Sequence, residues 1–94
     1  MPVDMWTVTL TGQAKKAPHN LSKHAFCAFG LLLEQMHLKG PYRYDWPNFS
    51  KLSSGEYHCH IEKGRPTYVA CWRVDKFNKI IEVYYAGTHE KAPY

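Results

Sequence analysis

The chain has 94 residues, of which 45% are hydrophobic and 21% are charged; this balance excludes a disordered chain, and the length predicts one domain, residues 1–94. The formal net charge of +4 favours an anionic partner, such as nucleic acid or an acidic protein. Three cysteines without a C-x-x-C spacing argue against a disulfide framework and predict reduced thiols.

The chain carries no sign of export or membrane insertion. Residues 1–12 lack a charged segment followed by an apolar run, so we expect no signal peptide. The longest apolar run, residues 25–33, is too short to span a bilayer. We therefore expect a cytoplasmic protein with no membrane contact.

The first half of the chain predicts one strand followed by two helices. Residues 5–10 alternate between apolar and threonine side chains, which is the period of a strand. Residues 11–17 predict a short helix, and Pro18 disfavours helix at the residue before it, so we expect a break at Ala17. Across residues 19–38, apolar side chains recur every three or four positions, which predicts an amphipathic helix.

The second half predicts an ordered loop and then three strands. Residues 42–55 are rich in aromatic and turn-forming residues, which favours a loop. The strand candidates are 56–63, 67–74 and 79–86, joined by connections of hairpin length, and residues 87–94 form a tail. The order β-α-α-β-β-β predicts an α+β domain, with a helical hairpin packed on one face of a mostly antiparallel, twisted sheet.

Side chains alternate across a strand, so each candidate strand divides its residues between a face covered by the helices and an open face. The expected covered set is Tyr57, Cys59, Ile61, Tyr68, Ala70, Trp72, Val74, Ile81, Val83 and Tyr85. The expected open set is His58, His60, Glu62, Val69, Cys71, Arg73, Ile80, Glu82 and Tyr84. Because Cys59 then points away from both histidines, a His-Cys-His metal site within this strand is geometrically poor.

The element order and several segments resemble the RelE/ParE superfamily of toxins from bacterial toxin–antitoxin pairs. The segments are "KLSSGEYHCHI", "PTYVACWRV" and "IIEVYYAGTHEKAPY". Histidines at both basic positions of "YHCHI" and the Gly-Thr-His of the tail make the chain most similar to the YafQ-type mRNA interferases. The resemblance implies a small RelE-like domain that acts as a ribosome-dependent mRNA endoribonuclease and is inhibited by a cognate antitoxin.

The resemblance also implies roles for individual residues. His58 and His60 take the positions of basic catalytic residues, and His89 takes the position of an acid in the tail. Tyr94 matches an aromatic residue that in relatives stacks on an mRNA base. Val69 stands where many RelE-type members carry an arginine, so another cation is needed at the phosphate.

Metal-independent cleavage of RNA requires a base for the 2′-OH proton, an acid for the leaving 5′-oxygen, and positive charge at the phosphate. Histidine suits both proton-transfer roles because its pKa lies near neutrality. We expect His58 or His60 to be the base, His89 the acid and Arg73 the phosphate contact. Further candidates for contact with RNA are Arg65, Lys63, Lys91, Tyr84 and Tyr94, of which the tyrosines can stack on bases.

Other interpretations remain open at this stage. Glu82 fits a salt bridge to Arg73 as well as a catalytic carboxylate, and the three lysines of residues 15–23 can contact rRNA or an antitoxin. A toxin of the same fold that acts by protein binding, such as a ParE-like gyrase inhibitor, is an alternative. A zinc site formed by His58, His60 and His89 is a less favoured one.

The expected partners follow from the toxin interpretation. They are a cognate antitoxin, mRNA and the ribosome, and we expect no cofactor and no metal. The antitoxin is expected to cover the basic open face or to dock on the helical hairpin. The protein would then be a monomer when free and a hetero-oligomer with its antitoxin.

Overall fold

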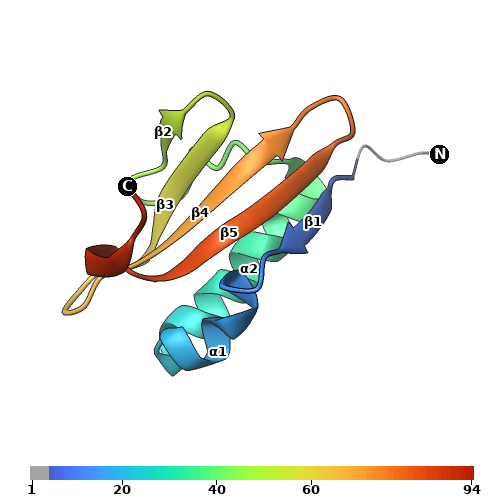
Figure 1. The fold of residues 1–94 in the computed structure, drawn as a ribbon. Helices are drawn as coiled ribbons and strands as arrows, with labels where there is room; N and C mark the ends of the chain where they lie inside the picture. The colour runs from blue at the N-terminus through green and yellow to red at the C-terminus, as the bar shows by residue number, and fades with distance from the viewer. Residues whose placement is uncertain (1–4) are drawn as a thin grey trace.

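The computed structural model describes residues 5–94. It contains a five-stranded sheet with two α-helices packed on one of its faces (Figure 1). The strands are β1 (Thr7–Leu10), β2 (Ser50–Ser53), β3 (Glu56–Glu62), β4 (Tyr68–Asp75) and β5 (Ile80–Thr88). Their order in the sheet is β1-β5-β4-β3-β2; β1 and β5 are parallel, and the other neighbours are antiparallel. The predicted α+β class with a mostly antiparallel sheet is confirmed. The first four residues of the predicted domain lie outside the described residues.

β2 is a strand where the sequence predicted a loop. It pairs with β3 so that Ser50 lies opposite His58, and the N–H of His60 donates to the Pro47 carbonyl at 2.8 Å just before β2 begins. β2 is an edge strand of four mostly exposed residues, and it therefore lacks the apolar alternation that marks a strand in a sequence. Its presence places a serine hydroxyl next to His58.

The helical segment breaks later than predicted. The 3₁₀ turn η1 (Ala14–Lys16) runs directly into α1 (Ala17–Asn20), with the proline in the first turn of α1, where its missing N–H breaks no helical hydrogen bond. The break at Ala17 was therefore wrong. The chain turns instead at Leu21, and Ser22 caps α2 (Lys23–Lys39) by accepting from the Ala25 N–H at 3.0 Å.

One face of α2 packs on the sheet and forms the core. Its buried side chains are Ala25, Phe29, Leu32 and Met36, spaced by three or four residues as predicted. They meet the covered face of the sheet, where Cys59, Ile61, Ala70, Trp72, Ile81 and Val83 are buried as expected. Full burial of a side chain such as Phe29 or Leu32 stabilises the fold by about 1.5–3 kcal/mol. The Trp72 indole N–H donates to the Pro41 carbonyl at 3.1 Å, so the buried polar atom is satisfied.

Two irregularities in the sheet overturn two face assignments. Between Cys71 and Trp72 the pairing of β4 with β5 shifts, and Tyr85 consequently packs on the open face instead of the covered one. A second shift, between His60 and Glu62 in β3, moves the Glu62 side chain from the expected open face to the covered face. The Glu62 carboxylate reaches the helix side, where it accepts from the Ser22 hydroxyl at 3.0 Å and pairs with His24.

Among residues 5–94, no helix combines the length and the apolar character that a membrane crossing requires.

Candidate functional site

Four aromatic rings form a closed group on the open face, beside β3. They belong to His58 and His60 of β3 and to His89 and Tyr94 after β5. The ring centroids lie 5.9 Å apart for His58–His60, 5.5 Å for His60–His89, 5.8 Å for His89–Tyr94 and 4.6 Å for Tyr94–His58. We call these four residues the histidine cluster. The contacts close a quadrilateral with His58 and His89 at opposite corners.

The chain reaches β3 a second time because it turns across the end of β4. Thr88 pairs with Tyr68 at the end of β5, and the His89 N–H then donates to the Thr67 carbonyl at 2.8 Å. The 3₁₀ turn η2 (His89–Lys91) carries the chain past β4 toward β3 (Figure 1). Ala92 packs over the buried residues of the open face, and this contact holds the tail against the sheet.

His58 is the buried member of the histidine cluster, with 8% of its surface exposed. Its Nδ1 lies 3.1 Å from the Ser50 hydroxyl. Burial lowers the pKa of His58 most, a hydrogen bond with the Ser50 backbone raises it in part, and the electrostatic interaction with His89 lowers it again. The result is a ring that stays neutral at pH 7, with one nitrogen held by β2.

His60 lies between His58 and His89 and is half-buried. Its Nδ1 is buried and has no hydrogen-bond partner among the described residues. Burial lowers the pKa of His60 most, and electrostatic interactions with His58, His89 and Lys63 lower it further. An unsatisfied buried nitrogen costs about 1–3 kcal/mol, so the fold keeps this ring at a cost to its own stability.

Two cations lie near the exposed end of the histidine cluster. Arg65 and His89 line one pocket of about 450 Å³ between the β3–β4 turn and η2. Lys63, at the end of β3, is close enough to His60 to act on its pKa. Lys91 lines a different pocket of about 320 Å³, which also contains His19. The structure therefore brings Arg65 and Lys63 to the cluster and places Lys91 beside it.

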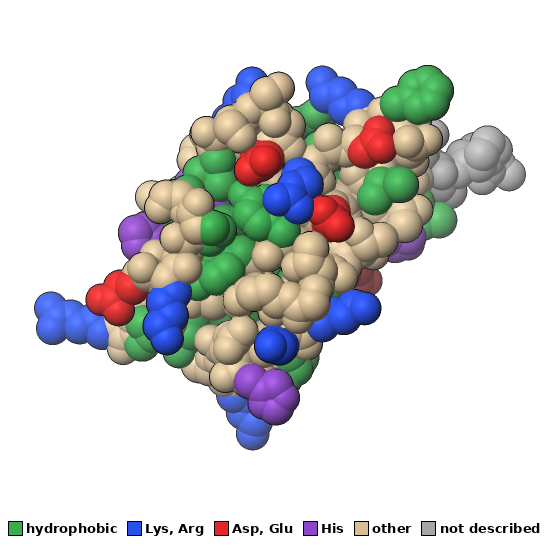
Figure 2. Space-filling model, in the orientation of Figure 1, with side chains coloured by type: hydrophobic (Ala, Val, Ile, Leu, Met, Phe, Trp, Pro, Cys, Tyr) green, Lys and Arg blue, Asp and Glu red, His purple; other side chains and the backbone are tan. Residues whose placement is uncertain are grey.

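Arg73 belongs to a separate group on the same face, which we call the arginine cluster. Its Nη1 donates to Glu82 Oε1 at 2.7 Å, its Nε lies 4.0 Å from Glu56 Oε2, and its guanidinium lies 4.1 Å from the centre of the Tyr84 ring. The Tyr84 hydroxyl donates to Glu56 Oε1 at 3.0 Å. Figure 2 shows blue and red side chains next to one another on this face.

The arginine cluster is distant from the histidines. His60 pairs with Val69, which precedes Arg73 by four residues in β4. Four residues of a strand span roughly 13 Å, so the arginine does not reach a phosphate held at His60. The ring of Tyr84 is covered by the guanidinium, and burial together with the Glu56 hydrogen bond raises the pKa of its hydroxyl. The structure thus leaves Arg73 and Tyr84 out of the histidine cluster.

The described side chains were compared with the arrangements that bind metal ions in proteins. Within residues 5–94, no group of three or more His, Cys, Asp or Glu side chains is arranged to hold a metal ion.

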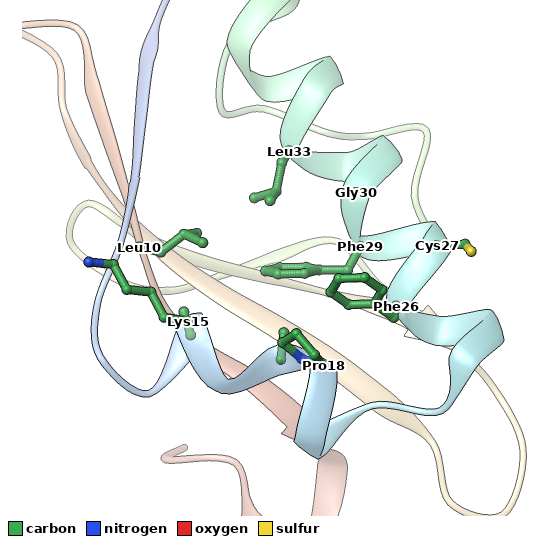
Figure 3. A pocket seen from close by; sticks show the side chains of 10 residues that line it. Leu10, Lys15, Pro18, Phe26, Cys27, Phe29, Gly30 and Leu33 are labelled. Carbon is green, nitrogen blue, oxygen red and sulfur yellow. The ribbon is translucent and has the colours of Figure 1, made fainter.

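A second candidate site is an apolar groove of about 400 Å³ on the helix side (Figure 3). Leu10 of β1 and Leu33 of α2 point toward one another across it, and Pro18, Phe26 and Phe29 line its length, as Figure 3 shows. Phe26 remains 42% exposed although it is a large apolar side chain. The sequence predicted the helical hairpin as one of two docking surfaces for an antitoxin, but it did not predict this groove, because helical periodicity does not show that Phe26 stays exposed.

Comparisons with known proteins identify the fold. No protein-family model matches the sequence, and no curated protein is similar to it. The structure is similar to the crystal structure of the archaeal RelE–RelB complex from Pyrococcus horikoshii OT3, with a TM-score of 0.70 and 15% sequence identity. The match covers 94% of this chain and 99% of that chain. The chain therefore has a RelE-like fold, and the similarity does not single out the YafQ type.

Proposed function

We propose that this protein is the toxin of a toxin–antitoxin pair, a ribosome-dependent endoribonuclease that cuts mRNA by metal-independent histidine chemistry. The observation that carries the proposal is the histidine cluster, in which His58 and His89 occupy opposite corners of a quadrilateral of rings. A phosphate above its centre would have one histidine on each side, as in-line displacement at phosphorus requires. Its RelE-like fold supports the same proposal.

His58 is the better base of the two strand histidines. The Ser50 backbone favours a proton on the nearby Nδ1, which leaves the lone pair of the neutral ring on Nε2. Because burial lowers its pKa, the ring is unprotonated at pH 7 and can accept the proton of the 2′-OH. The Tyr94 ring covers His58 in the free protein, so we infer that the RNA displaces this ring.

The other cluster members complete the reaction. The 2′-oxygen attacks phosphorus as His58 takes its proton, the bond from phosphorus to the 5′-oxygen breaks, and His89 protonates that oxygen. The products are a 2′,3′-cyclic phosphate and a 5′-hydroxyl. His60 donates to a phosphate oxygen, and Arg65 and Lys63 supply positive charge at the exposed side.

The growth arrest that follows induction provides the test. We expect His89→Gln to abolish the arrest and the codon-linked cuts that primer extension detects on translated mRNA. Glu82→Gln is the matched control, because Glu82 lies in the arginine cluster and pairs with Arg73. Arrest that persists in His89→Gln without cuts would instead favour a toxin that acts by protein binding.

The partner in this proposal is an antitoxin whose acidic amphipathic helix occupies the apolar groove. Residues 12–33, which form most of its walls, contain three lysines and no aspartate or glutamate. An apolar groove with a basic border matches a helix that has one apolar face between acidic residues. The similar archaeal RelE was itself crystallised as a complex with RelB.

Copurification tests this partner. The probe is the protein encoded by a short reading frame adjacent to the toxin gene, coexpressed with the toxin. Phe26→Asp places a charge in the groove, and we expect it to prevent copurification and neutralisation. Phe77→Asp makes the same substitution at a side chain that is 94% exposed and outside the groove, and it should copurify normally. Equal retention of both variants would contradict the assignment of the groove.

A further inference from the structure

The turn between β4 and β5 holds an aromatic side chain in solvent. Phe77 is 94% exposed, and it follows Lys76 in a turn whose shape is fixed by its own residues. Asp75 Oδ1 accepts from the Asn78 backbone N–H at 3.1 Å, and Oδ2 accepts from the Asn78 side chain at 2.8 Å. The turn therefore presents Phe77 from an ordered support, and its single carboxylate is already occupied.

A polar pocket of about 530 Å³ lies beside this turn. Lys51 of β2 and Lys76 of the turn line it from two neighbouring hairpins, and Tyr42 and Tyr57 provide aromatic walls. The two tyrosine rings meet edge to face with centroids 5.5 Å apart. We call Phe77 and this pocket the hairpin end. Figure 2 shows an exposed hydrophobic side chain near Lys or Arg side chains at the end of the molecule where the turn lies in Figure 1.

The positive charge of the hairpin end is not cancelled locally. Among residues 5–94, the only acid that lines the pocket is Asp75, whose oxygens are used within the turn and whose pKa is lowered by those hydrogen bonds. The nearby glutamates, Glu56 and Glu82, are held by Arg73. Both Lys51 and Lys76 are exposed, so their ammonium groups are accessible to a partner.

We propose that the hairpin end is a second RNA-binding surface, which holds two backbone phosphates on Lys51 and Lys76 and stacks an unpaired base on Phe77. Lysines interleaved with exposed aromatic rings are the composition of sequence-tolerant RNA contacts. Gly55 lines the pocket of the hairpin end, and His60 follows it by five residues along β3. The hairpin end therefore lies roughly 17 Å from His60. The inference rests on the proposed function and adds to it a contact that orients the toxin on ribosomal RNA.

The test is binding of the purified protein to a fluorescein-labelled 2′-O-methyl RNA of about 12 nucleotides, a length within the range of known single-strand sites. Its blocked 2′-oxygens prevent cleavage, so binding is measured alone. Lys51→Gln combined with Lys76→Gln should reduce the slope of log affinity against log salt by about 1.4, the value for two phosphate contacts. Phe77→Ser should weaken binding about five- to hundredfold at constant salt.

A matched control distinguishes binding at the hairpin end from nonspecific attraction of RNA to the positive charge of the whole protein. Lys16→Gln combined with Lys23→Gln also removes two exposed lysines, but from the helix side. The inference is overturned if the control reduces the slope equally, or if neither pair changes it. It is also overturned if the hairpin-end variants bind the RNA normally and lose only cosedimentation with purified ribosomes, because the partner is then a protein.

The outcomes for this surface and for the proposed chemistry are independent. His89→Gln should keep the RNA affinity of the hairpin end and lose cleavage. If the hairpin-end variants lose RNA binding while His89→Gln still produces cuts, the histidine mechanism fails and the second surface stands.

Discussion

The open face of the sheet carries two polar clusters that differ in how well their groups are paired. In the arginine cluster, Arg73 contacts two carboxylates and a ring, and the Tyr84 hydroxyl has an acceptor. In the histidine cluster, three ionisable rings of like kind surround one another, and the buried Nδ1 of His60 has no partner among the described residues. The first arrangement satisfies its own charges, whereas the second leaves a buried ring nitrogen without a hydrogen bond.

This difference is informative because the two clusters share one sheet and one face. Paired charges at a protein surface stabilise a fold by about 0–1 kcal/mol and leave little capacity to bind anything else. Unpaired buried groups persist when they serve a function, since they lower stability. The candidate site is therefore the cluster that destabilises the fold, and the predictions below test that contrast.

Among the variants that compare the two clusters, replacement of His60 should have the largest effect, and the effect is on cleavage. His60→Phe keeps a planar ring and should lower the rate of mRNA cleavage about 100-fold, because the phosphate loses the hydrogen bond from the other ring nitrogen, Nε2. The same variant should raise the free energy of unfolding by about 1 kcal/mol, since no buried nitrogen is left unsatisfied. Urea denaturation and primer extension measure the two effects. If His60→Phe lowers the free energy of unfolding and keeps full cleavage activity, the claim that the histidine cluster serves cleavage at a cost in stability is contradicted.

An intermediate effect is expected in the pH dependence of stability. The pKa of His58 is lower in the folded protein than in the unfolded chain, so the unfolded chain binds more protons as pH falls below about 6.5. Stability should therefore fall between about pH 7 and pH 5, by at most about 1.4 kcal/mol per pH unit for this group. Thermal denaturation across this range should show a shallower dependence in His58→Gln; an unchanged dependence would contradict the assigned burial.

The smallest effect is expected in the arginine cluster. Arg73→Gln removes an exposed cation from two glutamates and should lower the free energy of unfolding by at most about 1 kcal/mol. Cleavage should remain within twofold of the original protein, because Arg73 lies roughly 13 Å along β4 from Val69, the residue paired with His60, and its guanidinium is held by two glutamates. Chemical denaturation and primer extension check both parts. A large loss of cleavage would return Arg73 to the role that the sequence suggested.

Strand alternation predicted the faces of most residues correctly. His58 and His60 share the open face, with Cys59 buried on the other side, because β3 is regular up to His60. Beyond that point a bulge changes the side of Glu62, and another changes the side of Tyr85. A bulge adds one residue to one strand, and nothing in the apolar pattern of these strands signals it.

The remaining parts of the site depend on contacts between distant segments. His89 meets His60 only because the chain turns at the end of β4, and Ser50 meets His58 only because an exposed edge strand forms. Neither contact follows from periodicity. The helix break was recoverable, since Ser22 before an apolar helix is an N-cap signal and Pro18 is tolerated in a first turn.

The most direct test of the central claim is the pH profile of single-turnover mRNA cleavage on the ribosome. The proposed base and acid predict a bell-shaped profile. His58→Gln should remove the limb in which the rate rises with pH. The residual single-turnover rate of His89→Gln, too slow to leave cuts in cells, should lack the limb in which the rate falls. Cleavage by both variants at the original rate, with both limbs intact, would show that the histidine cluster is not the active site.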